Sequence, residues 1–166
     1  MSAGQPEGAR FYGLYRAVVS RNDDPDGLGR IKAKVRAFGD EETAWALPAL
    51  PFAGPGVGLY LIPPPKTNVW VLYEEGLRWK PVWVGCFWMY DPVDPGRLSG
   101  AKPAVKLLKT SIATITIDDD QKAVAIETAD GRVSITSSAV EVTNGQASVQ
   151  LSGQKVSING NALEVT

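Results

Sequence analysis

The sequence has no histidine and a single cysteine, and these two shortages narrow the range of possible functions. Histidine is the commonest general base in enzymes and the commonest protein ligand of zinc and iron, so most hydrolase triads and most transition-metal sites are excluded. Cys86 cannot form a disulfide within the chain, and its apolar neighbours predict a buried, unreactive thiol. We therefore expect no catalytic residue, no metal and no cofactor.

The sequence also lacks a strong net charge and long apolar runs. Its 17 basic and 18 acidic residues give a net charge of −1 and a pI of about 5.5, so it has no overall basic field for binding nucleic acid. It contains no run of about 18 apolar residues, and its first ten residues lack the apolar segment of a secretion signal. We expect a chain that is made and kept in a cytosol unless a dedicated machine exports it, and that binds no nucleic acid.

Aromatic residues and prolines are absent from the last part of the chain. All 14 aromatic residues lie between Phe11 and Tyr90, and all 12 prolines lie at or before Pro103. The segment before this change is rich in Pro, Gly and Asp, which suits an extended linker. We predict an N-terminal arm at residues 1–10, a folded domain at 11–90, a linker at 91–104 and a second structure at 105–166.

Short strands with irregular connections are predicted in the folded domain. Segments rich in β-branched and aromatic residues lie at 11–19, 30–35, 69–73 and 82–87. Ile31, Ala33 and Val35 alternate so that they share one face. Helical periodicity is weak, and Gly- and Pro-rich segments separate the strands. Five or six short strands over about 80 residues are typical of a small barrel of the oligonucleotide/oligosaccharide-binding (OB) type.

The last part of the chain repeats a pair of aliphatic residues two positions apart. The pairs are Ile115/Ile117, Val124/Ile126, Val133/Ile135, Val140/Val142, Val149/Leu151, Val156/Ile158 and Leu163/Val165. Each pair predicts a short strand with one apolar face, followed by a tight turn. One chain alone cannot enclose a core with such strands, because their apolar faces and edges stay exposed. We predict an intertwined β-helix of three chains, which pair their strand edges and bury the pairs up to Ile158 as the trimer core.

Several motifs of the folded domain resemble one family in their order and spacing. They are Asp26-Gly27-Leu28-Gly29-Arg30-Ile31 with the following strand, Trp45-Ala46, the Gly-rich segment 53–58, Ile62-Pro63, the strand 69–76 and Pro81–Gly85. The family is that of the baseplate spike proteins of contractile phage tails (baseplate assembly protein V) and the VgrG-type spikes of related injection systems. The motif residues singled out are Gly27, Gly29, Arg30, Ile31, Trp45, Gly54, Pro63 and Gly85. The chain departs from the family pattern at 63–65 and 76–81.

Individual motif residues have physical roles in such a barrel. Gly27 and Gly29 allow positive φ before the second strand, and Gly85 allows close backbone approach in the last strand. For Arg30 two interpretations stay open, an ion pair across a subunit interface or a solvated strand residue.

The resemblance implies an all-β chain, with an N-terminal OB-fold barrel followed by a C-terminal trimeric β-helix, that serves as a non-enzymatic, membrane-puncturing spike at the end of a tail tube. It implies a homotrimer that docks on a baseplate hub protein, makes transient contact with the target membrane, and belongs to a virion or extracellular injection particle. Family tips are often sealed by histidines around iron or by a separate conical protein rich in Pro-Ala-Ala-Arg repeats. Since histidine is absent, we expect such a tip protein, docked on Ile158, Leu163 and Val165.

Other functions remain open on the same sequence. Asp118-Asp119-Asp120 could hold calcium or simply form a turn, and Glu74-Glu75 is better explained as a strand end than as an acid/base pair. Five tryptophans could stack bases or sugars, as in an OB-fold nucleic-acid or carbohydrate-binding protein with a β-helical trimerisation tail. A trimeric β-helical enzyme acting on polysaccharide is a third possibility.

Overall fold

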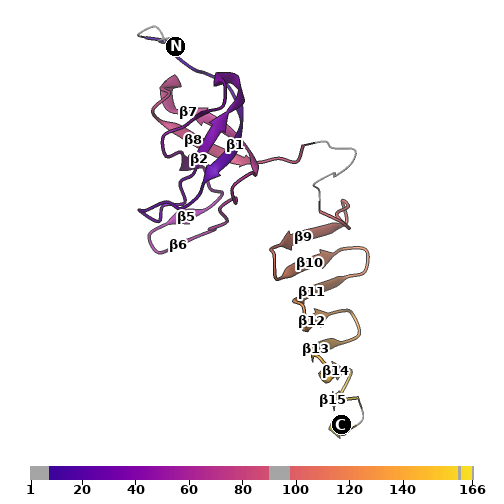
Figure 1. The fold of residues 1–166 in the computed structure, drawn as a ribbon. Coiled ribbons are helices and arrows are strands. Elements are labelled where there is room, and N and C mark those ends of the chain that lie inside the picture. Colours follow the sequence, from indigo (N-terminus) through magenta and orange to yellow (C-terminus); the bar gives the residue numbers. More distant parts are fainter. Residues whose placement is uncertain (1–7, 90–97, 161, 166) are drawn as a thin grey trace. The chain divides into compact units, whose positions relative to one another are not determined.

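The chain forms two compact units, residues 1–97 and residues 98–166, in the computed structural model shown in Figure 1. The structure describes residues 8–89, 98–160 and 162–165. Residues 1–7 of the predicted arm and 91–97 of the predicted linker lie outside these ranges. Within them, regular structure is β apart from two short 3-10 turns, and no helix is long and apolar enough to cross a membrane. The all-β class is confirmed.

Unit 1 is a curled sheet with strand order β3-β2-β1-β7-β8-β4. Two 3-10 turns, η1 (Arg36–Phe38) and η2 (Glu74–Gly76), follow β2 and β7, and β5 and β6 form a separate hairpin. The strands are β1 (Tyr15–Arg21), β2 (Lys32–Val35), β3 (Glu41–Glu42), β4 (Leu47–Pro48), β5 (Ala53–Gly54), β6 (Val57–Gly58), β7 (Asn68–Tyr73) and β8 (Pro81–Cys86).

The segment that contains β3 and β4 closes this sheet into an OB-type barrel. β3 pairs antiparallel with β2, and β4 pairs parallel with β8. Ala46, which lies between β3 and β4, exchanges two backbone hydrogen bonds of 2.8 and 3.2 Å with Ile31, the residue before β2. The segment therefore pairs with both β2 and β8, two strands that are not neighbours in the sheet order.

Strand alternation fills the barrel with a small core. Ile31, Ala33 and Val35 are fully buried, as their spacing predicts. β7 alternates in the same way, with every second residue buried. Trp83 of β8 adds the largest side chain of the core and is 4% exposed. The barrel thus has its own hydrophobic core.

A β-bulge interrupts the pairing of β7 with β8 beside Gly85. Trp70 pairs with Gly85 and Val71 with Trp83, so β8 holds one extra residue between them. Gly85 has a φ of 146°, a conformation that favours glycine. The close backbone approach expected there is wrong, because a Cβ at this position would meet no atom within 4 Å. The bulge, and not crowding, accounts for the glycine.

Cys86 ends β8 with an exposed side chain, so the expected burial of this thiol is wrong. Its apolar neighbours in sequence misled the prediction, because the barrel wall ends at this residue. Partial removal from water still raises the pKa of the thiol, which lowers its reactivity at neutral pH.

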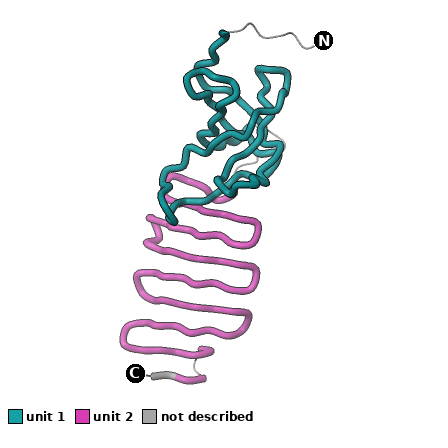
Figure 2. Tube along the Cα trace, turned by 90° about the vertical axis from the view of Figure 1, so that its left-hand side faces the viewer, with its two compact units in different colours: residues 1–97 teal, residues 98–166 magenta. Residues whose placement is uncertain are grey.

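Unit 2 is one antiparallel sheet in which eight strands follow each other in chain order (Figure 2). The turns between them contain two to four residues. The strands are β9 (Val105–Lys109), β10 (Thr114–Asp118), β11 (Ala123–Glu127), β12 (Gly131–Ile135), β13 (Val140–Asn144), β14 (Ala147–Ser152), β15 (Lys155–Ile158) and β16 (Leu163–Val165).

The strands of unit 2 pair within one chain, which corrects one expectation. The strand edges of the predicted β-helix were to be paired by sister chains, yet β10 to β15 each have both neighbours in the same chain. Turns of two to four residues are long enough for hairpins and too short to pass around a partner chain. Partner chains are therefore needed to cover a face of this sheet, and not its edges.

Candidate functional site

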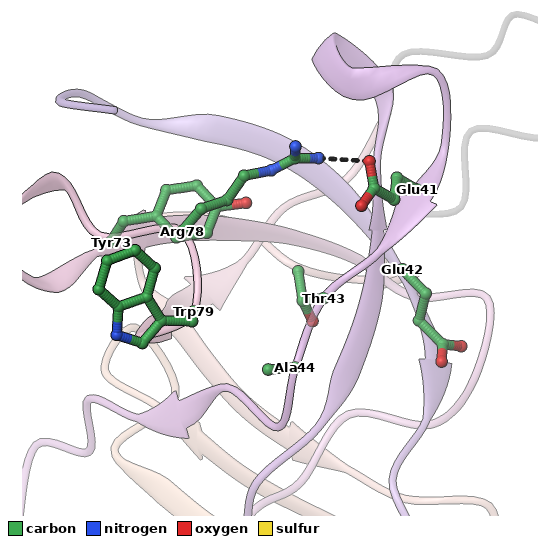
Figure 3. A pocket seen from close by; sticks show the side chains of 7 residues that line it. All are labelled: Glu41, Glu42, Thr43, Ala44, Tyr73, Arg78 and Trp79. Atoms are coloured by element: carbon green, nitrogen blue, oxygen red, sulfur yellow. Dashed lines mark hydrogen bonds and ion pairs between the residues drawn. The ribbon is translucent and has the colours of Figure 1, made fainter. Parts of the chain in front are cut away.

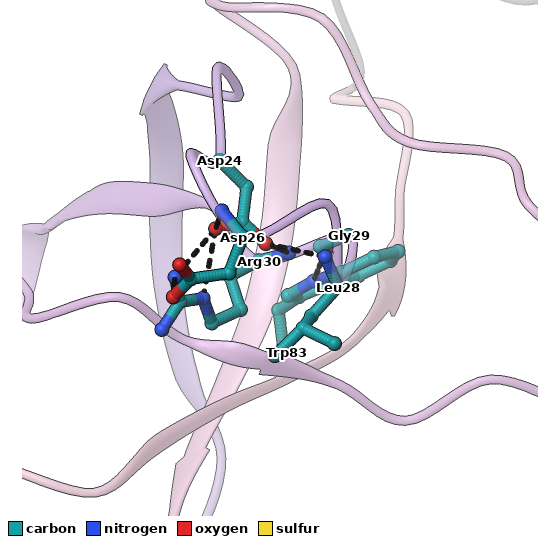
Figure 4. A network of polar contacts seen from close by, with 6 residues as sticks. All are labelled: Asp24, Asp26, Leu28, Gly29, Arg30 and Trp83. Carbon is teal, nitrogen blue, oxygen red and sulfur yellow. Dashed lines mark hydrogen bonds and ion pairs between the residues drawn. The ribbon is translucent and has the colours of Figure 1, made fainter.

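The loop between β1 and β2 is organised around the carboxylate of Asp24 (Figure 4). This carboxylate accepts backbone N–H bonds from Asp26 at 3.1 Å, Leu28 at 2.8 Å and Arg30 at 3.1 Å. The Arg30 side chain adds two more bonds, from Nε at 2.9 Å and Nη2 at 2.6 Å. One buried acceptor thus fixes the whole motif segment from 24 to 30.

Arg30 forms ion pairs inside its own chain, so the interpretation as a solvated strand residue is wrong, whereas an ion pair across a subunit interface stays a prediction. Its side chain is only 18% exposed and bonds to Asp24, whose side chain is 2% exposed, and to Asp26. The Arg30 bond holds the pKa of Asp24 far below its usual range, although desolvation acts in the opposite direction. The pair is a structural element of the loop.

Gly27 and Gly29 adopt positive φ, as their positions before the second strand predict. A Cβ at Gly29 would lie 2.8 Å from Cδ1 of Ile62, so that side chain would have to shift to make room. The indole N–H of Trp83 donates to the Gly29 carbonyl at 3.1 Å. The motif therefore ties the loop to the barrel core.

The remaining motif residues are spread over the barrel. Trp45 lies beside three cationic side chains, with Arg21, Arg30 and Lys32 at 5.3, 5.7 and 5.5 Å from its ring centre. Pro63 is buried, and Gly54 lies in the exposed β5–β6 hairpin. Together with Gly27, Gly29 and Ile31, these residues shape the barrel and do not gather into one site.

A hollow of about 300 Å³ beside β3 is the best candidate for a ligand site in unit 1 (Figure 3). Glu41, Arg78 and Trp79 line it. Arg78 donates to Glu41 at 2.7 Å and lies over the ring of Phe38 at 4.1 Å. The cation of this hollow is therefore already engaged by the protein.

The two glutamates of this hollow do not form an acid/base pair. Figure 3 shows Glu42 pointing away from the Glu41–Arg78 ion pair. Glu42 instead accepts from Ser20 at 2.7 Å and Lys32 at 3.3 Å, and the Ser20 bond is the main cause of its lowered pKa. The two carboxylates thus bond to different partners and do not face a common space, as paired acid/base catalysis would require.

The acidic cluster of unit 2 belongs to the β10–β11 turn. Asp118 accepts the backbone N–H of Gln121 at 3.0 Å. The next two aspartates form ion pairs with Lys106 and, at 3.3 Å, with Lys102. Within the described part of the chain, no group of three or more acidic, cysteine or histidine side chains is arranged to hold a metal ion. These bonds support the turn interpretation.

The aliphatic pairs of unit 2 stack in register on one face of the sheet. Ile115 lies opposite Ile126, Ile117 opposite Val124, and the same placement continues strand by strand to Ile158 opposite Leu163. We name this surface the aliphatic face. It consists of Leu108, Ile115, Ile117, Val124, Ile126, Val133, Ile135, Val140, Val142, Val149, Leu151, Val156, Ile158 and Leu163.

The aliphatic face is open to solvent in the single chain. Twelve of its residues have exposed fractions from 36% for Ile115 to 54% for Leu163, whereas Val140 and Val156 are partly buried. The opposite face carries small and polar residues, among them Ser134 and Gln150. The side chain of Val165 lies outside what the structure describes. A continuous apolar surface of this length indicates an interface.

Sequence reasoning missed the acceptor role of Asp24 and the position of Arg78. The spacing Asp24-x-Asp26-Gly27 was a usable signal, since Asp often accepts backbone N–H bonds two residues onward in turns. Nothing local predicts Arg78, because its partners Glu41 and Phe38 lie on a distant segment.

Two family models match the chain, one to each unit. Residues 15–88 match the type VI secretion system/phage-baseplate injector OB domain. Residues 105–164 match the phage baseplate V C-terminal trimerisation domain, which supports a homotrimer. A search among curated proteins gave no match. The two matches lie one after the other along the chain and together cover most of both units. The chain therefore belongs to the baseplate spike family of phage tails and type VI secretion injectors.

Proposed function

We propose that three copies of this chain form the membrane-puncturing spike at the end of the tail tube of a contractile injection machine. Family membership gives the coarser role, a structural baseplate component of a virion or injection particle. The observation that carries the finer proposal is the aliphatic face, whose pairs run in register from β10 to β15.

The aliphatic face is best buried by two further copies around a three-fold axis. Three sheets that turn this face inward form a three-sided prism, and each strand level then contributes the same aliphatic pair three times. Every pair from Ile115/Ile117 to Val156/Ile158 would lie in the prism interior as the trimer core. Turning the aliphatic face inward keeps the opposite face on the outside of the prism, so assembly buries none of its polar side chains. Ser134 of that face is already buried within one chain.

Such a prism is stiff along its axis. Its strands cross the axis and are hydrogen bonded at each level, so bending would break backbone bonds and expose aliphatic residues together. Residues 105–166 contain no aromatic residue, so the outer face offers few side chains that favour the membrane interface. Both properties suit a part that is driven through a membrane by sheath contraction and makes only transient contact with lipid.

The two ends of the spike require partners. We propose that unit 1 docks on a baseplate hub protein at the end of the tube, after assembly in the bacterial cytoplasm. In unit 2, β16 is paired on one side only, with β15. A conical tip protein of the Pro-Ala-Ala-Arg type would cover the other edge of β16 together with Ile158, Leu163 and Val165.

The proposal is tested by two neighbouring substitutions in β14. Leu151 belongs to the aliphatic face and Gln150 to the opposite face, and both side chains are exposed in the single chain. Leu151→Asp places three carboxylates in the trimer core, at a cost of several kcal/mol for each buried charge. We expect light scattering of this variant to show loss of the trimer.

Gln150→Asp is the matched control, because it adds the same charge one residue away. It should leave the mass and the melting temperature of the trimer unchanged. If both variants keep the trimer with the same melting temperature, the aliphatic face does not lie in the trimer core and the proposed spike is wrong.

An OB-fold protein that binds nucleic acid or sugar is the alternative favoured by one observation. Trp79 is 69% exposed at the rim of the hollow beside β3. Its neighbour Arg78 is held by Glu41 and Phe38, which leaves the cation poorly placed for a phosphate. This function explains unit 1 and leaves the aliphatic face of unit 2 without a role.

A further inference from the structure

A second apolar surface lies on unit 1, in a segment without a single charged residue. Residues 44–65 contain no Asp, Glu, Lys or Arg, and also no Ser, Thr, Asn or Gln. Much of this segment is nevertheless open to solvent, with Phe52 57%, Val57 58% and Tyr60 61% exposed. We name this surface the uncharged patch. It consists of Leu47, Phe52, Val57, Leu59, Tyr60 and Leu61.

The uncharged patch combines a projection with a hollow. The β5–β6 hairpin, which carries Val57, lies at one end of unit 1 (Figure 1). Beside it, a hollow is lined by Leu28, Leu47, Leu50 and Phe52. Contiguous exposed apolar surface of this kind marks an interaction site on a soluble protein. Burial in the barrel core does not explain the patch, since each of its six residues is at least 43% exposed.

The composition of the patch favours a second copy of the same surface as its occupant. A partner surface with the usual density of charges would have to bury some of them against a segment that offers no opposite charge, at a large cost. Another copy of residues 44–65 brings no charge into the contact. The patch therefore matches itself better than it matches an ordinary protein surface.

The trimerisation domain brings such copies together. The last strand of unit 1, β8, and the first strand of unit 2, β9, are separated by the 18 residues from Phe87 to Ala104. A segment of this length spans at most roughly 60 Å even when fully extended. Three copies of unit 1 tethered to one trimer of unit 2 meet at an effective concentration in the millimolar range. A contact that is weak between free chains is then occupied.

We propose that the uncharged patch packs against the neighbouring copy of unit 1, so that the three barrels contact one another directly as well as through unit 2. Contacts in a three-fold ring join two different parts of the surface. The β5–β6 hairpin of one copy therefore faces the hollow of the next. This contact rests on the proposed trimer, but it names a separate interface of its own.

The test is site-specific photocrosslinking in the full chain. A benzoylphenylalanine in place of the exposed Tyr60 would attach to whatever covers this position. We expect covalent dimers and trimers on a denaturing gel, with the attachment mapped by mass spectrometry to residues 44–65 or to Leu28. The same group in place of Lys34, an exposed residue of β2 outside the patch, is the control and should give at least fivefold less product.

The outcomes separate this contact from the proposed trimer. Light scattering of the same samples reports whether three chains are present. If the mass is that of a trimer and position 60 attaches to unit 2 or to nothing, the patch contact is wrong and the trimer stands. If the mass is that of one chain, the trimer and the patch contact are both wrong.

Discussion

At the scale of single residues, Asp24 shows how one buried carboxylate sets the conformation of a loop. Its two oxygens accept three backbone N–H bonds and two bonds from the Arg30 side chain. Gly27 and Gly29 supply the backbone conformations that bring these donors to a single point. The conformation of this loop thus combines one buried acceptor with two glycines of positive φ.

Asp24→Asn should change how the stability of the barrel depends on pH. The pKa of Asp24 is lowered in the folded state relative to about 3.9 in the unfolded chain. Below about pH 4 the unfolded state thus binds a proton that the folded state does not, and the stability from this group is lost as the pH falls. Near pH 3, the variant should therefore take up about one proton fewer on unfolding than the wild-type chain does.

Denaturant unfolding at several pH values measures this effect. Asp23→Asn is the comparison, because Asp23 lies next in the chain and is exposed. The Arg21 hydrogen bond also lowers the pKa of Asp23, so this variant should change the pH dependence in the same direction but less than Asp24→Asn. An equal pH dependence in the wild-type chain and in Asp24→Asn would show that Asp24 does not organise the loop.

Residue identities were only partly predictable. The positive φ of Gly27 and Gly29 follows from the motif, because glycine is favoured where the chain turns tightly into a strand. The partners of Arg30 and the exposure of Cys86 did not follow from the sequence. They depend on where the loop folds back and where β8 leaves the barrel, which local sequence does not specify.

At the scale of elements, three hairpin turns of unit 2 share the same hydrogen-bonding pattern around a threonine. Thr110, Thr128 and Thr136 each begin a turn and accept, through the side-chain oxygen, a backbone N–H two or three residues later. In each turn the threonine N–H also donates to the carbonyl of the residue three positions on. This local bonding favours a reversal of the chain at fixed places.

Thr136→Val tests the contribution of the threonine hydroxyl to the β12–β13 turn. The Thr136 hydroxyl accepts from the N–H of Ala139 at 3.1 Å and donates to its carbonyl at 3.1 Å. Valine keeps the shape of threonine and loses both bonds, so we expect a destabilisation of about 1 kcal/mol per chain. Thermal unfolding measures it, with Ser137→Ala in the same turn as a control near zero. Equal melting of the two variants would contradict the role of the hydroxyl.

Strand positions were the most predictable part of the fold. Alternation placed Ile31, Ala33 and Val35 on one face, and the aliphatic pairs marked the strands of unit 2. The pairing partner of each strand was not predictable, because an aliphatic pair has the same spacing in a hairpin and in an intertwined helix. Turn lengths of two to four residues decide for hairpins.

At the scale of the whole molecule, two units of different composition divide the work. Unit 1 holds every described aromatic side chain and has a closed core, whereas unit 2 exposes its aliphatic face. A core that one chain leaves open has to be completed by other copies. The change in composition along the sequence predicts this division. Large aromatic side chains fill the core of a small barrel, whereas short strands with one aliphatic face need partner chains to bury that face.

The most direct measurement is the mass of the purified full chain in solution by multi-angle light scattering. Three copies of a 17.8 kDa chain give about 53 kDa, and our account predicts this value over the working concentration range. A folded, soluble species of 17.8 kDa would contradict it, because the aliphatic face would then be stable in water without a partner.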